Sequence, residues 1–479
     1  MNHSDQDPPR HGFTGAIDAQ GAVHMRGVEY PQCTGDTQSV GSSDSLSHPD
    51  YLDIEAAGCW ARIRLPEDAD ARAHLISLWG HLRAADSPVC QGRLAGVEQR
   101  MSAEPSIVVG PPTSLGPGYD FDLSGQLTLE LLCHLVGSRL LLHAGVVDVD
   151  DLGPVLLIGP SGAGKSTATI ELARHGLYLT DEMACLDPRT LAVEAYAKPI
   201  SRVVSEGQRP TDSIRSRYKE DFAPSALGMR VGDRASAPVA VVLLERSDHH
   251  QGPPVLTSAS LMEALPFIVS QSSSVWALPD ALQLLVRLCR GQFGVLKASY
   301  REAGDLVTAL RSSLTGAPEQ MWEHLPLSQA VGVAAGQTTK NSGDFSGTVC
   351  SARMIESAHA FGLAGTIGPA HPVEPSDSGT ETIEGKDLTG CSYQLLPFAD
   401  AGLLPEGLMI LRDSQVITLS GAGAAVWLSL YEDGVLSYAQ LLEYALNSGE
   451  DVPPALIEDG LRTALSSLIG NRLATTLPS

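Results

Sequence analysis

The chain has 479 residues, which is enough for about three domains of ordinary size. Its formal net charge of −24 excludes a nonspecific hold on nucleic acid or on an anionic membrane surface, because such binding needs clustered cations. Its eight cysteines include no CxxC pair, which argues against a zinc ribbon and against a disulfide framework.

The character of the sequence changes near residue 50. Residues 1–50 are rich in Ser, Asp, Gly, Gln and Pro and poor in aliphatic residues, which predicts a disordered arm. They contain no basic segment followed by an apolar one, and no apolar run of the chain approaches the ~18 residues of a membrane span, so we expect a cytoplasmic protein. Residues 51–135 have apolar runs with helical spacing at 73–82 and 126–136, which predict a small α+β domain.

The middle of the chain predicts an α/β domain followed by a linker. Residues 136–326 alternate apolar strand candidates with helical stretches, which indicates a sheet flanked by helices. Residues 327–394 are dominated by Gly, Ser, Thr and Ala without a sustained period. We expect a flexible linker there, which would raise the local concentration of anything bound to the following module.

The C-terminal segment, residues 395–479, regains a regular pattern. Two apolar strands separated by a polar RDSQ turn predict a hairpin at 408–419. Three helices are predicted after it, and the second begins with a capping box formed by Ser437 and Gln440. The apolar face of the third helix consists of Ile457, Leu461, Ala464 and Leu468. A hairpin with three helices indicates a winged-helix-like module.

A phosphate-binding loop is the most specific motif of the chain. The sequence GPSGAGKST begins at Gly159, directly after an apolar strand candidate and directly before a helical stretch. Its glycines allow successive backbone N–H groups to converge on a phosphate at the positive end of the helix. Lys165 is expected to reach the β- and γ-phosphates, and Ser166 is expected to bind Mg²⁺ through its hydroxyl. The predicted ATP site consists of Gly159, Ser161, Gly162, Ala163, Gly164, Lys165, Ser166 and Thr167.

The surroundings of the loop resemble a known kinase family. A His-Ala pair at His143, a strand, the phosphate loop, a helix and a strand ending in Asp181 and Glu182 follow in the order of HPr kinase/phosphorylase and of the related kinases found beside lasso-peptide genes. The resemblance implies that Asp181 takes the proton of a substrate hydroxyl, that His143 supports it and that Glu182 helps to hold magnesium. For His143 the alternative is an ordinary hydrogen-bonded histidine, and for Glu182 a solvent-facing side chain.

Other side chains are weaker candidates for the same site. Lys198 precedes a proline, as in a Lys-Pro pair that related kinases have near the nucleotide, and Glu245 ends an apolar strand as a Walker-B acid would. Trp276, Trp322 and the RSRY sequence at 215–218 could lie on segments that capture the substrate. Each of these could equally be an ordinary surface or core residue.

The C-terminal module resembles the PqqD-like fold, which binds peptides in ribosomal-peptide modification. The hairpin, a helix start rich in small residues, Trp427 and two further helices follow in the expected order. The resemblance implies that a leader peptide adds to the hairpin edge as an extra strand. A DNA-binding winged helix is the alternative, but the third helix and its end offer only Arg462 and Arg472 as cations.

These patterns together predict an ATP- and Mg²⁺-dependent kinase that phosphorylates serine or threonine in a ribosomally made precursor peptide. The catalytic residues would be Asp181, His143 and Lys165, and the metal ligands Ser166 and Glu182. A nucleotide-binding peptide chaperone or scaffold without phosphotransfer is one alternative, and a kinase of a free small hydroxylated metabolite is another. The resemblance to HPr kinases also implies a homo-oligomer.

Overall fold

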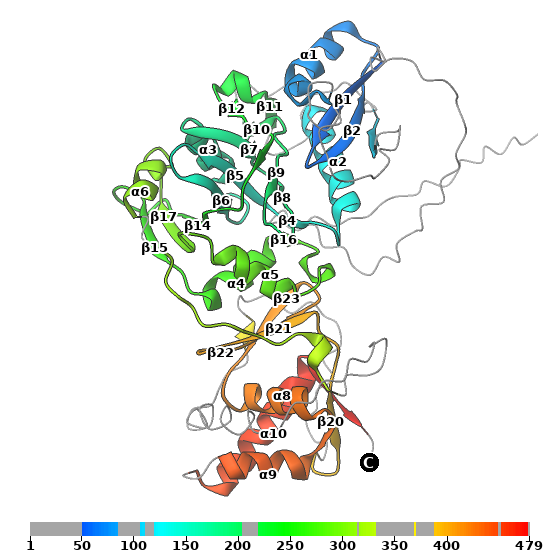
Figure 1. Ribbon diagram of the computed structural model, residues 1–479, viewed down its shortest axis with the longest axis vertical. Coiled ribbons are helices and arrows are strands. Elements are labelled where there is room, and N and C mark those ends of the chain that lie inside the picture. Colours follow the sequence, from blue (N-terminus) through cyan, green and yellow to red (C-terminus); the bar gives the residue numbers. More distant parts are fainter. Residues whose placement is uncertain are drawn as a thin grey trace, which may run out of the picture.

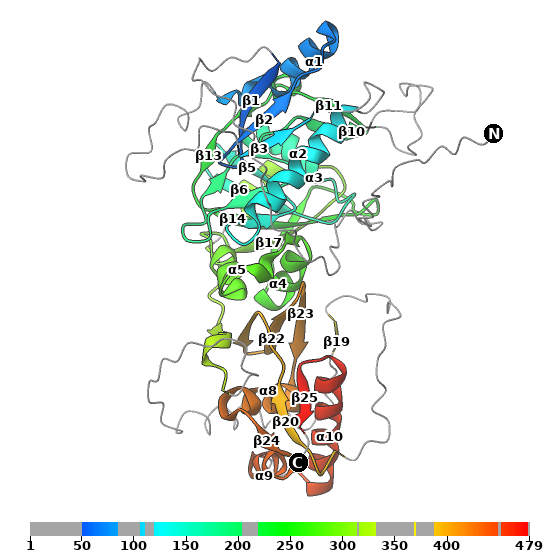
Figure 2. The ribbon, with the colours of Figure 1, turned by 90° about the vertical axis from the view of Figure 1, so that its right-hand side faces the viewer.

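The computed structural model describes residues 50–84, 106–110, 119–203, 219–313, 316–331, 368–369, 388–448 and 452–477. Figures 1 and 2 show three units along the long axis, with the N-terminal domain at one end and the C-terminal module at the other. The predicted arm, apart from Asp50, and the RSRY sequence at 215–218 lie outside the described residues. Within the described part, no helix is both long and apolar enough to cross a membrane.

The N-terminal part of the described chain contains three short strands and two α-helices. It contains β1 (Tyr51–Ala56), β2 (Cys59–Arg64), α1 (Ala69–Trp79), η1 (Gly80–Leu82), β3 (Ile107–Val109) and α2 (Tyr119–Leu135). Strands β1 and β2 are antiparallel, and β3 joins β2 in parallel. Every second residue of β1 is buried, which gives the sheet one face for the helices to cover.

The central domain is built around a seven-stranded sheet in the order β12-β7-β5-β6-β14-β17-β15. Its first half comprises β4 (Leu140–Leu142), β5 (Ala144–Val149), β6 (Gly153–Ile158), α3 (Lys165–Ala173), β7 (Gly176–Thr180), β8 (Ala184–Leu186), β9 (Val193–Glu194), β10 (Ile200–Val203) and β11 (Lys219–Phe222). Its second half comprises η4 (Pro224–Leu227), β12 (Arg230–Val231), β13 (Arg234–Ala235), β14 (Ala240–Arg246), β15 (Val255–Ser258), α4 (Leu261–Ser270), β16 (Ser272–Ser273), η5 (Val275–Ala277), α5 (Ala281–Cys289), β17 (Val295–Tyr300) and α6 (Leu306–Ser313). Strands β6, β14 and β17 are parallel, whereas β5 runs antiparallel between β6 and β7.

The C-terminal module has two small sheets and three helices. Its elements are β18 (Glu323–His324), η6 (Leu327–Gln329), β19 (Gly368–Pro369), β20 (Ser392–Leu395), β21 (Asp400–Leu404), β22 (Gly407–Arg412), β23 (Gln415–Leu419), α8 (Gly421–Asp433), β24 (Leu436–Ser437), α9 (Tyr438–Ser448), α10 (Pro454–Gly470) and β25 (Ala474–Leu477). The predicted hairpin is confirmed as β22 and β23. The capping box is confirmed too, because the Gln440 N–H donates to Ser437 Oγ at 3.3 Å and the Ser437 N–H donates to Gln440 Oε1 at 2.9 Å.

The segment predicted as a linker contributes strands to this module. Strand β20 pairs with β24 and β25, and β19 pairs with the outer edge of β23. Strand β18, which precedes the predicted linker, pairs with the opposite edge of the sheet at β21. The described residues of 327–394 are therefore partly structural, because their backbone groups complete two sheets.

The three units share their cores. Side chains of β21 and β22, including Leu404, Met409 and Leu411, pack into the same buried cluster as helices α4 and α5 of the central domain. On the other side, Leu141, Cys185 and Tyr196 of the central domain belong to the buried cluster of the N-terminal domain. The C-terminal module is thus docked against α4 and α5, a contact that the sequence does not predict.

Candidate functional site

The phosphate loop joins the end of β6 to the start of α3. Gly162 and Gly164 have φ angles of 87° and 84°, in the left-handed region that favours glycine. A Cβ at Gly159 would lie 3.0 Å from the Cβ of Ala163 and 3.1 Å from that of Leu244, closer than nearly all side-chain contacts. The three glycines therefore allow the tight turn that directs backbone N–H groups into the loop at the positive end of α3.

Lys165 lies inside this loop. Its ammonium group donates a hydrogen bond to the carbonyl of Gly159 at 2.6 Å, and the side chain is buried. Ser166 follows on the first turn of α3 and is half-buried, while Thr167 is exposed. The loop thus brings one cation and one hydroxyl to the end of the helix, as the sequence predicts, and this pair is what a triphosphate with its metal requires.

Two residues that sequence reasoning did not identify support the loop. The hydroxyl of Tyr300 donates to the carbonyl of Ala163 at 2.7 Å, and a Cβ at Gly164 would lie 3.4 Å from Cδ of Arg246. The guanidinium of Arg246 donates to the carbonyl of Arg301 at 3.1 Å. Arg246 is the last residue of β14 and Tyr300 is the last residue of β17, the two strands parallel to β6. Their position at the carboxyl ends of apolar strands is the feature of the sequence that could have identified them.

Strand β5 brings His143, Asp181 and Glu182 to the edge of the sheet that carries the phosphate loop. Asp181 and Glu182 follow β7, whereas the phosphate loop follows β6, and β5 lies between these two strands in the sheet. Because β5 is antiparallel to both, its first residue lies at the edge where β6 and β7 end. His143 directly precedes β5, and the N–H of Ala144 donates to the carbonyl of Glu182 at 3.1 Å. The topology therefore brings His143 and both acids to the edge that carries the phosphate loop.

The two acids share one buried cation. The ammonium of Lys198 lies 2.9 Å from Oε2 of Glu182 and 3.7 Å from Oδ1 of Asp181, and its side chain is only 2% exposed. Burial by itself lowers the pKa of Lys198, but the charges of Asp181, Glu182 and Asp221 more than offset this and raise it. The hydroxyl of Tyr178 donates to Asp181 Oδ1 at 3.0 Å and fixes the orientation of that carboxylate. Lys198, a weak candidate in the sequence, is thus central to the cluster.

His143 is kept neutral at ordinary pH. Its backbone N–H donates to the carbonyl of Gln271 at 2.7 Å. Burial lowers the pKa of the imidazole to about 4, the positive charges of Lys165 and Lys198 act in the same direction, and Glu182 opposes them. His143 is therefore a buried, uncharged imidazole within electrostatic reach of Lys165, Glu182 and Lys198.

The other weak candidates lie elsewhere. Glu245 is exposed and pairs with Lys297 at 3.1 Å, so its carboxylate takes part in a surface ion pair. Trp276 is 41% exposed on η5. Trp322 donates from its indole to Gln283 Oε1 at 2.8 Å and covers Gly402, where an added Cβ would collide with the indole ring. Trp322 therefore belongs to the contact between the central domain and the C-terminal module.

Oxygen ligands for magnesium are present beside the loop. Ser166 offers a hydroxyl and Glu182 a carboxylate that is 37% exposed, and such hard oxygen donors fit Mg²⁺, which also takes phosphate oxygens and water. Among the described residues, the one group of three close metal-ligand side chains is Asp280, His324 and Asp400, at the contact with the C-terminal module. In that group the Asp400 carboxylate already accepts hydrogen bonds from His324, from its neighbour's N–H and from two N–H groups of α5.

Comparisons with known proteins give one named resemblance. No protein-family model and no curated protein matches the chain. The solved structures that match include the Hpr(Ser) kinase/phosphatase from Coxiella burnetii, at 13% sequence identity and a TM-score of 0.21. That match covers 36% of this chain and 88% of the other. At these values the match does not establish a shared activity.

Proposed function

We propose that the protein is an ATP- and magnesium-dependent kinase that phosphorylates a serine or threonine hydroxyl in a ribosomally made precursor peptide. The observation that supports it best is the meeting of the phosphate loop, with Lys165, and the cluster of Asp181, Glu182 and Lys198 at one sheet edge. Phosphoryl transfer needs chiefly a held triphosphate, neutralised charge and a group that accepts the proton of the attacking hydroxyl.

The residues divide these tasks as follows. The backbone N–H groups of the loop and the ammonium of Lys165 hold the β- and γ-phosphates, with Lys165 exchanging the Gly159 carbonyl for phosphate oxygens. Ser166 and Glu182 would hold the Mg²⁺, which neutralises phosphate charge when it is bound. Asp181 accepts the proton of the acceptor hydroxyl as the new O–P bond forms and ADP leaves.

Lys198 and Tyr178 hold the side chain of Asp181 in place for this proton transfer. The Lys198 ammonium lies 3.7 Å from Oδ1 of the buried Asp181, and the Tyr178 hydroxyl donates to the same Oδ1 atom. The neutral imidazole of His143 adds no further positive charge next to Lys165 and Lys198. The acid, the lysine and the tyrosine therefore act as one positioned unit.

The C-terminal module is proposed to bind the leader part of the precursor. The hairpin β22–β23 followed by α8, α9 and α10 supports this proposal, because the PqqD-like resemblance rests on a hairpin followed by three helices. The outer edge of β23 accepts Gly368–Pro369 of the same chain as an antiparallel strand, so this edge supports strand addition. A leader peptide would take the place of that segment, at a fixed distance from the phosphate loop because the module is docked.

The proposal is tested with purified protein, ATP, Mg²⁺ and a peptide array in which serine and threonine vary in context. Lys165→Ala should abolish ATP binding in calorimetry and phosphate incorporation. Asp181→Asn should bind ATP like the wild type, whereas its phosphate incorporation should fall by about 100-fold or more, as for loss of a general base. Asp305→Asn, an exposed aspartate before α6, is the matched control.

Three outcomes contradict the proposal. If Lys165→Ala labels peptides as well as the wild type does, this loop is not catalytic. If ATP binds but no peptide or free hydroxyl compound is phosphorylated, the protein is a nucleotide-binding chaperone or scaffold. If free serine or threonine is phosphorylated better than any peptide, the acceptor is a small metabolite.

A further inference from the structure

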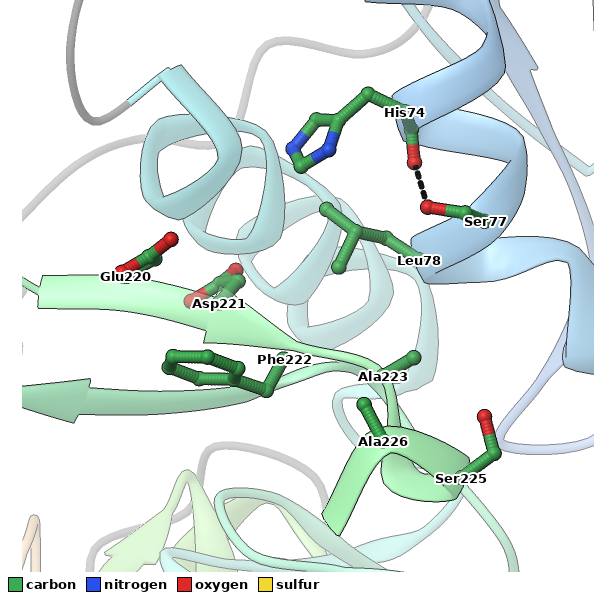
Figure 3. A pocket seen from close by; sticks show the side chains of 9 residues that line it. All are labelled: His74, Ser77, Leu78, Glu220, Asp221, Phe222, Ala223, Ser225 and Ala226. Atoms are coloured by element: carbon green, nitrogen blue, oxygen red, sulfur yellow. Dashed lines mark hydrogen bonds between the residues drawn. The ribbon is translucent and has the colours of Figure 1, made fainter.

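A pocket opens at the seam between the N-terminal and central domains, outside the phosphate loop. It has a volume of about 450 Å³ and is lined by α1 on one side and by β11 and η4 on the other (Figure 3). Figure 3 shows His74 and Leu78 of α1 across from Glu220, Asp221 and Phe222 of β11. Sites between domains commonly bind ligands, because two surfaces can enclose a group that neither could cover alone.

The lining of this pocket is negatively charged and partly apolar. Glu220 is an exposed carboxylate, the Asp221 carboxylate lies buried behind it, and the lining includes no lysine or arginine. Nε2 of His74 donates a hydrogen bond to Oδ2 of the Asp120 carboxylate at 2.8 Å, so this imidazole is already paired with an acid. Leu78, with Phe222 and two alanines, supplies an apolar wall. This combination fits a lysine or arginine side chain, whose alkyl stem packs on apolar groups while its charged end reaches a carboxylate.

The pocket is connected to the catalytic acids. Asp221 is 3% exposed and accepts hydrogen bonds from Ser124 of α2 at 2.6 Å and from Ser201 at 2.5 Å. Its charge also acts on Lys198, the cation shared by Asp181 and Glu182. Strand β10 begins two residues after Lys198 and pairs with β11, which lines the pocket. The pocket is therefore linked to the proposed acceptor site through Lys198 and the strand pair β10–β11 that follows it.

We infer that this pocket binds a positively charged side chain, a lysine or arginine, that flanks the phosphorylated hydroxyl of the acceptor peptide. The inference rests on the proposed kinase function and names the class of acceptor. Because α1 forms one wall of the pocket, the N-terminal domain would help to select the acceptor peptide.

The test uses two matched sets of synthetic peptides with the full-length protein. Each acetylated and amidated peptide has one central serine and, at one other position, either lysine or its uncharged counterpart norleucine. The wild type should phosphorylate the best lysine peptide about fivefold more efficiently, in kcat/KM, than its norleucine counterpart, the factor expected for one partly exposed ion pair. Glu220→Gln should reduce this preference, and Glu130→Gln, an exposed glutamate on α2, should leave it unchanged.

A second variant acts without a change of charge. Ala226→Leu fills the pocket from η4 at an exposed position, and it should reduce binding of the lysine peptide while circular dichroism remains that of the wild type. ATP affinity should be the same in all three variants. A preference that is absent in the wild type, or that survives both Glu220→Gln and Ala226→Leu, overturns the inference.

A binding measurement separates this inference from the kinase proposal. Ligand-observed NMR compares Nα-acetyl-lysine methylamide with its norleucine counterpart, in the presence of the nonhydrolysed analogue of ATP. Stronger binding of the lysine compound that is lost in Glu220→Gln supports the pocket even if no peptide is phosphorylated. Equal binding of the two compounds overturns the pocket even if phosphorylation is observed.

Discussion

Replacing Lys198 by methionine tests the buried charge cluster. The change removes a cation that is 2% exposed and lies 2.9 Å from Glu182 and 3.7 Å from Asp181. The carboxylates are then left partly buried without a counter-charge, and loss of one partner of a buried ion pair costs about 3–5 kcal/mol. We expect the free energy of unfolding to fall by that amount at pH 7, and phosphate transfer to fall with it because Asp181 is no longer held.

Lys297→Met is the matched control for this measurement. Lys297 pairs with Glu245 at 3.1 Å, a similar distance, but the two side chains are 41% and 49% exposed. An exposed pair contributes about 0–1 kcal/mol, so urea unfolding should separate the two variants clearly. If both variants lose the same free energy of unfolding, the reasoning about the cluster is wrong.

Three further predictions concern the loop, the docked module and pH. Tyr300→Phe removes the hydrogen bond to Ala163 and should weaken ATP binding in calorimetry by about 5-fold, the value of one hydrogen bond, and an unchanged affinity would contradict its role as a support. Gly402→Ala places a methyl group in the ring of Trp322 and should lower the thermal midpoint by several degrees, since overpacking costs about 1–3 kcal/mol. The lowered pKa of His143 means that the unfolded chain binds more protons between about pH 4 and 6.5, so the free energy of unfolding should fall as pH decreases through that window, and His143→Gln should show a smaller fall.

The motif and the local patterns of this chain were readable from the sequence. The strand–loop–helix around Lys165 follows from glycines at fixed positions, and the capping box at Ser437 follows from hydrogen bonds between residues three apart. These features are local, so spacing along the chain determines them.

The remaining parts of the site depend on contacts between distant segments. Lys198 is placed between the acids by the path of the chain after β9, and Arg246 reaches the loop only because β14 is the neighbour of β6. The docking of the C-terminal module was missed for the same reason, because Asp400 caps helix α5 more than a hundred residues earlier in the chain. Small and polar residues also predict a linker at 327–394, although the short strands β19 and β20, which include residues of that range, complete sheets.

The shared cores limit how this protein can be dissected. A fragment starting at residue 136 would lose the partners of Leu141, Cys185 and Tyr196, and one ending before residue 395 would uncover the apolar sides of α4 and α5. Either cut would leave newly wetted apolar surface, which promotes aggregation. A truncated protein could therefore lose activity because it does not fold, and not because a peptide-binding site is missing. Point substitutions at exposed positions are the better means of finding the function of each unit.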